Sequence, residues 1–180
     1  INHALKQLCA ENRVGYDEMH GEHLRPVHIK NESKYKYILF VRDPIMQFIS
    51  SYYYYKQRTG YPKGTPSTLN EFIDMLRINP AFREQMERVN LHFHYTLDKY
   101  VVNSQVAEIV PWYFIGTTET IHESFAALQK KMLGSVQLQL DRYNKTFKGK
   151  EPMGESKMEY LRTTYLKSNY EILKTFLEQP

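Results

Sequence analysis

The sequence predicts an α/β domain with a mainly parallel sheet, and three observations lead to that class. Apolar residues make up 42% of the 180 residues and stand in blocks between polar residues, as in a globular chain. Residues 35–41 (YKYILFV) end in a continuous apolar run that is typical of a buried parallel strand. Strands lead directly into helices at residues 41–44 and again near residue 116, which is the α/β pattern. The length fits one domain, residues 1–180.

The first elements follow from local signals. Residues 2–11 place apolar side chains on one face of a helix, including Cys9, the single cysteine, for which we expect a buried structural thiol. Residues 14–19 are consistent with a short strand. After the strand at 35–41, Asp43 is suited to cap a helix and Pro44 to begin it, and that helix should extend to about residue 58.

The rest of the chain is divided by glycine, proline and capping residues. The predicted elements are a loop at 60–67, helices at 68–77 and from 80 towards 100, a buried strand at 112–115 ending at Gly116, a helix capped by Thr117 or Thr118 and ending near 133, a basic loop at 145–154, and a final helix at 156–178.

The charge favours an anionic ligand. The net charge of +4 is too small to indicate nucleic acid on its own. Residues 129–150 contain six Lys or Arg side chains against one Asp, a stretch that either meets phosphate or sulfate groups or forms a solvated helix end and loop. No apolar run is long enough for a membrane segment, and no ligand set with metal spacing follows the histidines, so we predict no metal site.

The segment from Phe40 to Tyr55 (FVRDPIMQFISSYYYY) has the greatest chemical content. Arg42 stands at the end of a strand, and a guanidinium offers two parallel donors to a phosphate. Ser50, about two turns into the next helix, adds a hydroxyl, and the helix start adds N–H groups. Taken alone, an Arg-Asp-Pro turn is more often a capped connection than a ligand site.

The whole string strongly resembles the 3′-phosphate-binding segment of the sulfotransferases that use 3′-phosphoadenosine 5′-phosphosulfate (PAPS). The likeness is greatest to the carbohydrate branch, especially the heparan sulfate and uronyl 2-O-sulfotransferases, which share Arg-Asp-Pro-Ile and a tyrosine run. The resemblance implies that Arg42 and Ser50 hold the 3′-phosphate of the nucleotide. Gln47 departs from it, since the family often has a second arginine there. We expect most of the tyrosines to pack in the core, and one or two to face substrate.

The resemblance extends over nearly the whole chain. Segments similar to the family are the helix at 2–12, residues 90–94 (NLHFH), the Gly-x-Thr-Glu junction at 114–119, and the C-terminal end from Asn144. It implies a three-layer, P-loop-like fold with a short central parallel sheet flanked by helices, and PAPS as donor without a metal. The resemblance also implies that the acceptor is a hydroxyl group, and we expect that group to belong to a carbohydrate.

The histidines after the 14–19 stretch are the candidates for the catalytic base. The 2-O-sulfotransferases place a His-x-His pair at a similar point, whereas this chain has His20-Gly-Glu-His23, so both His20 and His23 remain candidates. Glu22 can orient a histidine or act as the base itself. Lys145 and Lys148, with Lys150, are candidates for contacts with the nucleotide or an anionic acceptor.

The family's phosphosulfate-binding strand and loop would precede residue 2, and we find no equivalent in the sequence. We expect little activity without that loop. The alternatives are a non-catalytic nucleotide- or glycan-binding descendant, a kinase, which would need a P-loop, and a polyanion-binding domain. The single cysteine and the lack of an anchor segment favour a cytoplasmic protein, and the alternative is a Golgi-lumenal or membrane-anchored protein whose anchor lies outside this sequence.

Overall fold

The computed structural model describes residues 2–13, 15, 36, 38–58, 64–89, 113–132 and 151–178. The chain forms two compact units. The sheet unit combines Ile1–Arg42 with Tyr100–Tyr143, and the helical unit combines Asp43–Lys99 with Asn144–Pro180. The boundary between the units therefore falls on the peptide bond that joins Arg42 to Asp43.

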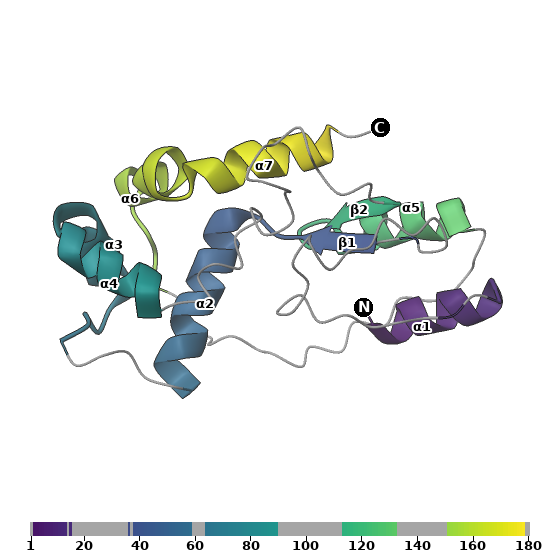
Figure 1. Ribbon diagram of the computed structural model, residues 1–180, viewed down its shortest axis with the longest axis horizontal. Helices are drawn as coiled ribbons and strands as arrows, with labels where there is room; N and C mark the ends of the chain where they lie inside the picture. The colour runs from purple at the N-terminus through teal and green to yellow at the C-terminus, as the bar shows by residue number, and fades with distance from the viewer. Residues whose placement is uncertain are drawn as a thin grey trace. The chain divides into compact units, whose positions relative to one another are not determined.

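The sheet unit contains a two-stranded parallel sheet. Strand β1 (Ile38–Val41) pairs with β2 (Phe114–Thr117) in a register that places Ile38 beside Phe114 and Val41 beside Thr117. Figure 1 shows the two strands side by side, with α5 (Ile121–Met132) following β2. A parallel pair of strands, one leading directly into a helix, confirms the predicted α/β class with a short parallel sheet.

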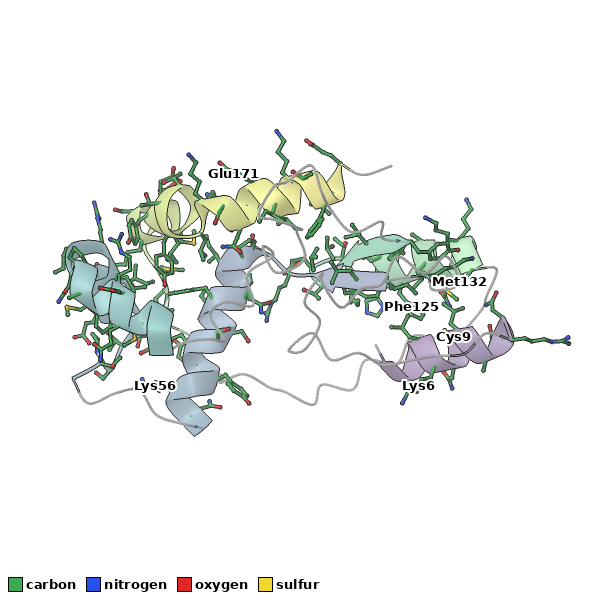
Figure 2. All side chains as sticks on the ribbon, viewed as in Figure 1. Lys6, Cys9, Lys56, Phe125, Met132 and Glu171 are labelled. Carbon is green, nitrogen blue, oxygen red and sulfur yellow. The ribbon has the colours of Figure 1, made fainter. Side chains whose placement is uncertain are left out.

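Helix α1 (Asn2–Glu11) forms the core of the sheet unit together with α5. Ala4, Leu5 and Leu8 pack in one cluster with Phe125 and Leu128. In Figure 2 the labelled side chains of Cys9 on α1 and of Phe125 and Met132 on α5 lie where the two helices face each other. Cys9 is buried, as predicted, and burial raises the pKa of its thiol above the ordinary value.

The helical unit holds the remaining described elements. These are α2 (Pro44–Arg58), α3 (Leu69–Ile78), α4 (Pro80–Val89), α6 (Glu155–Tyr160), the π-helical turn η4 (Leu161–Tyr165) and α7 (Lys167–Leu177). Short polar side chains stand at the starts of α3 and α4. The Thr68 hydroxyl accepts the Glu71 N–H at 3.2 Å, and the Asn79 side chain accepts the Phe82 N–H at 3.0 Å. Both bonds satisfy donors that a helix start leaves free.

Aromatic and aliphatic side chains from all of these elements form one core. Tyr52 and Phe72 are fully buried, with ring centroids 5.2 Å apart, and Phe82 meets Phe72 edge-on at 5.4 Å. Leu161 and Leu166 extend the same cluster from the C-terminal part of the chain. Each fully buried side chain of this size contributes about 1.5–3 kcal/mol, so this core fixes α2 against α3 and η4.

The second strand differs from its prediction. Residues 112–115 were expected to be the strand, with Gly116 as its end, but β2 includes Gly116 and ends at Thr117. The ring of Phe40 crosses Gly116 so closely that a Cβ there would lie 2.7 Å from Phe40 Cε1. The glycine therefore permits close packing inside the strand and does not terminate it.

The start of α5 and the continuity of the last helix also differ from the prediction. Thr117 or Thr118 was expected to cap α5, but Thr117 is the last residue of β2 and the Thr118 N–H donates to Val41 O at 2.8 Å, and α5 begins only at Ile121. The single helix expected at 156–178 is interrupted by η4, where the Leu166 N–H donates to Leu161 O at 2.7 Å.

Several predicted elements fall outside the described residues. They are the strand at 14–19, the start of the strand at 35–41, the first half of the loop at 60–67, the extension of α4 beyond Val89, and most of the basic loop at 145–154. The three-layer arrangement stays a prediction. Among the described helices, none has the length and apolar content that a membrane span requires.

Candidate functional site

Arg42 occupies the position where parallel sheets bind ligands. It follows Val41, the last residue of β1, and ligands in α/β folds bind beyond the carboxyl ends of the strands. Its side chain is 31% exposed, and its Nε lies 3.9 Å from Glu119 Oε1. The guanidinium is therefore accessible, and it has a carboxylate beside it.

The turn after β2 brings Glu119 to Arg42. The Thr118 N–H extends the parallel ladder onto Val41 O, as described above, and the Thr117 N–H donates to Ser124 Oγ at 3.0 Å. The Thr117 and Thr120 hydroxyls lie 2.6 Å apart. An ion pair of this exposure contributes only about 0–1 kcal/mol, so an incoming phosphate can displace Glu119 from Arg42.

Asp43 caps α2 with one carboxylate oxygen and contacts α7 with the other. Its Oδ1 accepts the Met46 N–H at 3.0 Å, and its Oδ2 accepts the hydroxyl of Tyr170 at 2.8 Å. The Gln47 N–H donates to the Asp43 carbonyl at 2.9 Å. The predicted cap is confirmed.

The same bonds limit how the helix start can act. The sequence suggested that N–H groups at the start of α2 would donate to a phosphate. The Met46 and Gln47 N–H groups already have acceptors on Asp43, and Pro44 has no N–H. These bonds reduce the number of helix-start N–H groups that could meet a phosphate, so the proposed anion binding relies more on side chains.

Ser50 lies within α2 and is half-buried. It belongs to the helical unit and Arg42 to the sheet unit, so each is described within its own unit. Ser50 is two residues before Tyr52, whose hydroxyl donates to Ser67 O at 3.1 Å. The packing of Tyr52 fixes the turn of α2 on which Ser50 lies.

Two of the three tyrosines of the run whose side chains are described lie in the core, where most of the run was expected to pack. Tyr52 and Tyr53 are buried, while Tyr54 is exposed. The Tyr53 hydroxyl accepts the Glu151 N–H at 3.0 Å. Burial, with a smaller contribution from the charge of Glu151, raises the pKa of Tyr52 to about 12, so this phenol is not a base at neutral pH.

Tyr170 is the side chain at this site for which the sequence carried no signal. Burial first, and then its hydrogen bond to the Asp43 carboxylate and the charge of that group, raise the pKa of Tyr170 to about 12. The guanidinium carbon of Arg162 lies 5.9 Å from the centre of its ring. Tyr170 and Asp43 are 127 positions apart in the chain, so no local pattern could have paired them.

The remaining predicted site residues lie outside the described part of the chain. They are His20, His23, Glu22, Lys145, Lys148 and Lys150. Within the described ranges, no group of three histidine, cysteine, aspartate or glutamate side chains is arranged to hold a metal ion.

Comparison with known proteins links this arrangement to one family. The model of a family described as "Sulfotransferase family" matches residues 4–176, a range that overlaps every described helix and strand. Comparisons with curated proteins and with solved structures found no match.

Proposed function

The chain belongs to the sulfotransferase family, and from that premise we propose that it transfers a sulfuryl group from PAPS to a hydroxyl group of a carbohydrate. The family match supports sulfuryl transfer. The donor and the acceptor are the finer parts of the proposal, and they rest on the Phe40–Tyr55 segment and its resemblance to the carbohydrate branch.

The observation that carries the proposal is the place of Arg42. It stands at the carboxyl end of a parallel strand, exposed enough to meet a ligand, with a weakly bound carboxylate beside it. A guanidinium can form two parallel hydrogen bonds to a phosphate. Arg42 and Ser50 are the residues proposed to hold the 3′-phosphate, which distinguishes PAPS from other adenine nucleotides.

The reaction needs one further group from the protein. An acceptor oxygen forms a bond to sulfur while the bond between sulfur and the phosphate oxygen breaks, which releases adenosine 3′,5′-bisphosphate. The acceptor proton passes to a base, for which His20, His23 and Glu22 are the candidates, and a base contributes ~10²–10⁴-fold in rate. Lys145 and Lys148 are proposed to neutralise charge on the nucleotide or on an anionic acceptor.

Retention on an adenosine 3′,5′-bisphosphate matrix tests the donor site. We expect the chain to be retained, to be released by free adenosine 3′,5′-bisphosphate, and to stay bound in 5′-AMP at the same concentration. Arg42→Ala should pass through, and Arg42→Lys should be retained weakly, because lysine keeps the charge and loses the forked donors.

Arg77→Ala is the matched control for that column. Arg77 is an exposed arginine of α3, near the ring of Tyr160, so its loss removes the same charge without touching the proposed site. Release of the wild-type chain by 5′-AMP as readily as by the bisphosphate would contradict a 3′-phosphate site. Equal retention of Arg42→Ala would contradict the role of Arg42.

The acceptor class has its own test. Incubation with ³⁵S-labelled PAPS and either a uronic-acid polysaccharide or a small phenol separates carbohydrate acceptors from small aromatic ones. The proposal predicts that any transferred label is found on the polysaccharide. Label on the phenol alone would place the chain in another branch of the family.

A further inference from the structure

A hydrogen bond from α7 holds the junction that follows Arg42. The hydroxyl of Tyr170 donates to Asp43 Oδ2 at 2.8 Å, while Oδ1 of the same carboxylate caps α2 through the Met46 N–H. An aspartate needs one oxygen to cap a helix. The second oxygen of Asp43 accepts the hydrogen bond from Tyr170.

The π-helical turn η4 sets the direction in which Tyr170 points. In an α-helix a residue five positions ahead lies about 140° round the axis, yet Leu161 and Leu166 reach the same core cluster. The π-turn, closed by the Leu166 N–H on Leu161 O, makes this possible. It rotates the following helix by about 100° relative to an uninterrupted one.

Tyr170 inherits that rotation directly. Its N–H donates to Leu166 O at 3.1 Å, which places it one turn after the π-turn. Arg162, within the π-turn, lies against its ring at 5.9 Å, a distance at which a cation and an aromatic face attract. An irregular turn, frequent at functional sites, thus aims a tyrosine at the aspartate beside Arg42.

We propose that Tyr170 is a positioning residue for nucleotide binding. By holding the Asp43 carboxylate, Tyr170 fixes the start of α2, the helix that carries Ser50. Asp43 itself is joined to Arg42 by one peptide bond. The inference rests on the proposed function, because Arg42 and Ser50 are the residues that would hold the 3′-phosphate. Tyr170 does not touch the nucleotide in this scheme, and it acts through the geometry of Asp43.

Calorimetric titration of Tyr170→Phe with adenosine 3′,5′-bisphosphate and with 5′-AMP tests the inference. The ring and its packing remain in this variant, and Asp43 Oδ1 still caps α2. We expect the dissociation constant of the bisphosphate to rise roughly ten-fold, the order of one lost hydrogen bond to a charged group, and that of 5′-AMP to stay unchanged. The ratio of the two constants is a readout that general destabilisation would not move.

Tyr160→Phe is the matched control. The hydroxyl of Tyr160, also half-buried and in the same C-terminal segment, donates to Leu76 O at 3.1 Å, away from Asp43. Its loss should change both dissociation constants by less than about two-fold. An equal effect of the two tyrosine variants would overturn the positioning role.

A second variant covers the case in which Tyr170→Phe fails to fold, as judged by circular dichroism. Asp43→Asn keeps a side chain that can cap a helix and removes the negative charge to which the Tyr170 hydroxyl donates. The same selective loss of bisphosphate affinity is therefore expected. Where both variants fold, the double variant should lose less than the sum of the two single losses, because both act on one bond.

The outcomes separate this inference from the function on which it rests. A wild-type chain that binds both nucleotides alike overturns both. A wild-type chain that prefers the bisphosphate, loses that preference in Arg42→Ala, and keeps it in Tyr170→Phe and Asp43→Asn overturns the positioning role alone.

Discussion

Gly116 allows β1, β2 and α5 to pack closely because it has no side chain. It lies within β2, opposite Phe40 of β1. A Cβ at this position would lie 2.7 Å from Phe40 Cε1 and 2.9 Å from Ser124 Cβ on α5. The Phe40 ring can tilt, but Ser124 Cβ moves only with the backbone of α5, so the sheet and α5 pack closely only around a glycine.

Replacing this glycine should therefore weaken the sheet unit. Gly116→Ala is expected to lower the free energy of unfolding by about 1–3 kcal/mol, as overpacked sites do, in urea denaturation followed by circular dichroism. Gly15→Ala, where the new methyl group would have no neighbour within 4 Å, is the control and should be nearly neutral. Equal stabilities of the two variants would show that the close approach at Gly116 is absent.

The raised pKa of Tyr170 gives a dependence on pH with a definite sign. Its pKa is raised from 10.0 to about 12, so the folded state holds the proton more tightly than the unfolded state. The stability that Tyr170 contributes is full below pH 10.0 and is lost as the pH rises towards about 12. Unfolding of wild type and Tyr170→Phe in urea, at about pH 8 and about pH 11, measures this contribution.

We expect the stability difference between these two proteins to shrink at the higher pH. Difference absorbance between them should also show one phenol that ionises later than an ordinary tyrosine. A difference that stays constant or grows with pH would contradict a raised pKa of Tyr170 in the folded state, whether from burial or from Asp43.

Asp43 and Tyr170 show which contacts of a single residue can be predicted from the sequence and which cannot. Asp43 before Pro44 is a local signal, and both the cap and the helix were predicted from it. Tyr170 is one tyrosine among 15, and its partner comes from the other end of the chain. The ion pair between Arg42 and Glu119 was not predicted either, because the two residues lie far apart in the chain. Glu119 was noted only as part of a Gly-x-Thr-Glu junction.

At the scale of elements, short polar side chains decide where helices begin. Thr68 precedes α3 and accepts the Glu71 N–H, with Glu71 in the acidic first turn, which is the sequence pattern of a capping box. Asn79 ends α3 and caps α4, so a single residue separates the two helices. These caps position α3 against the Tyr52 side of α2.

Removing the Thr68 cap should destabilise the helical unit. Thr68→Ala is expected to cost about 1 kcal/mol of unfolding free energy, measured by thermal and urea denaturation. Thr175→Ala is the matched control, because the Thr175 hydroxyl donates only to Glu171 O within its own helix, and its loss should change stability by less than about 0.5 kcal/mol. A larger loss in the control would assign the effect to packing.

The bounds of the helices could be predicted from local sequence patterns, whereas features that depend on long-range packing could not. Capping and proline signals placed α2 and α3 within one or two residues. The π-turn could not be predicted, since it arises because Leu161 and Leu166 both reach a core that is made largely by residues before position 90. Gly116 was misread because a glycine after an apolar run indicates a turn unless a ring from another strand lies over it.

At the scale of the whole molecule, the predicted α/β class is confirmed and the family is shown, but the predicted site is only partly described. Parallel pairing of β1 with β2 follows from two buried runs, each followed by a helix. The boundary between the two units passes between Arg42 and Asp43, inside the segment with the strongest resemblance. The sheet unit therefore ends at Arg42, and the helical unit begins with the residue that caps α2.

Calorimetric titration of the wild-type chain and of Arg42→Ala, with adenosine 3′,5′-bisphosphate and 5′-AMP, tests the central claim most directly. We predict that the wild type binds the bisphosphate at least about ten-fold more tightly than 5′-AMP, because a charge-assisted bond to the additional phosphate is worth more than a neutral one. Arg42→Ala should bind the two nucleotides alike. Equal binding of both nucleotides by the wild type, unchanged by the substitution, would contradict a 3′-phosphate site at Arg42.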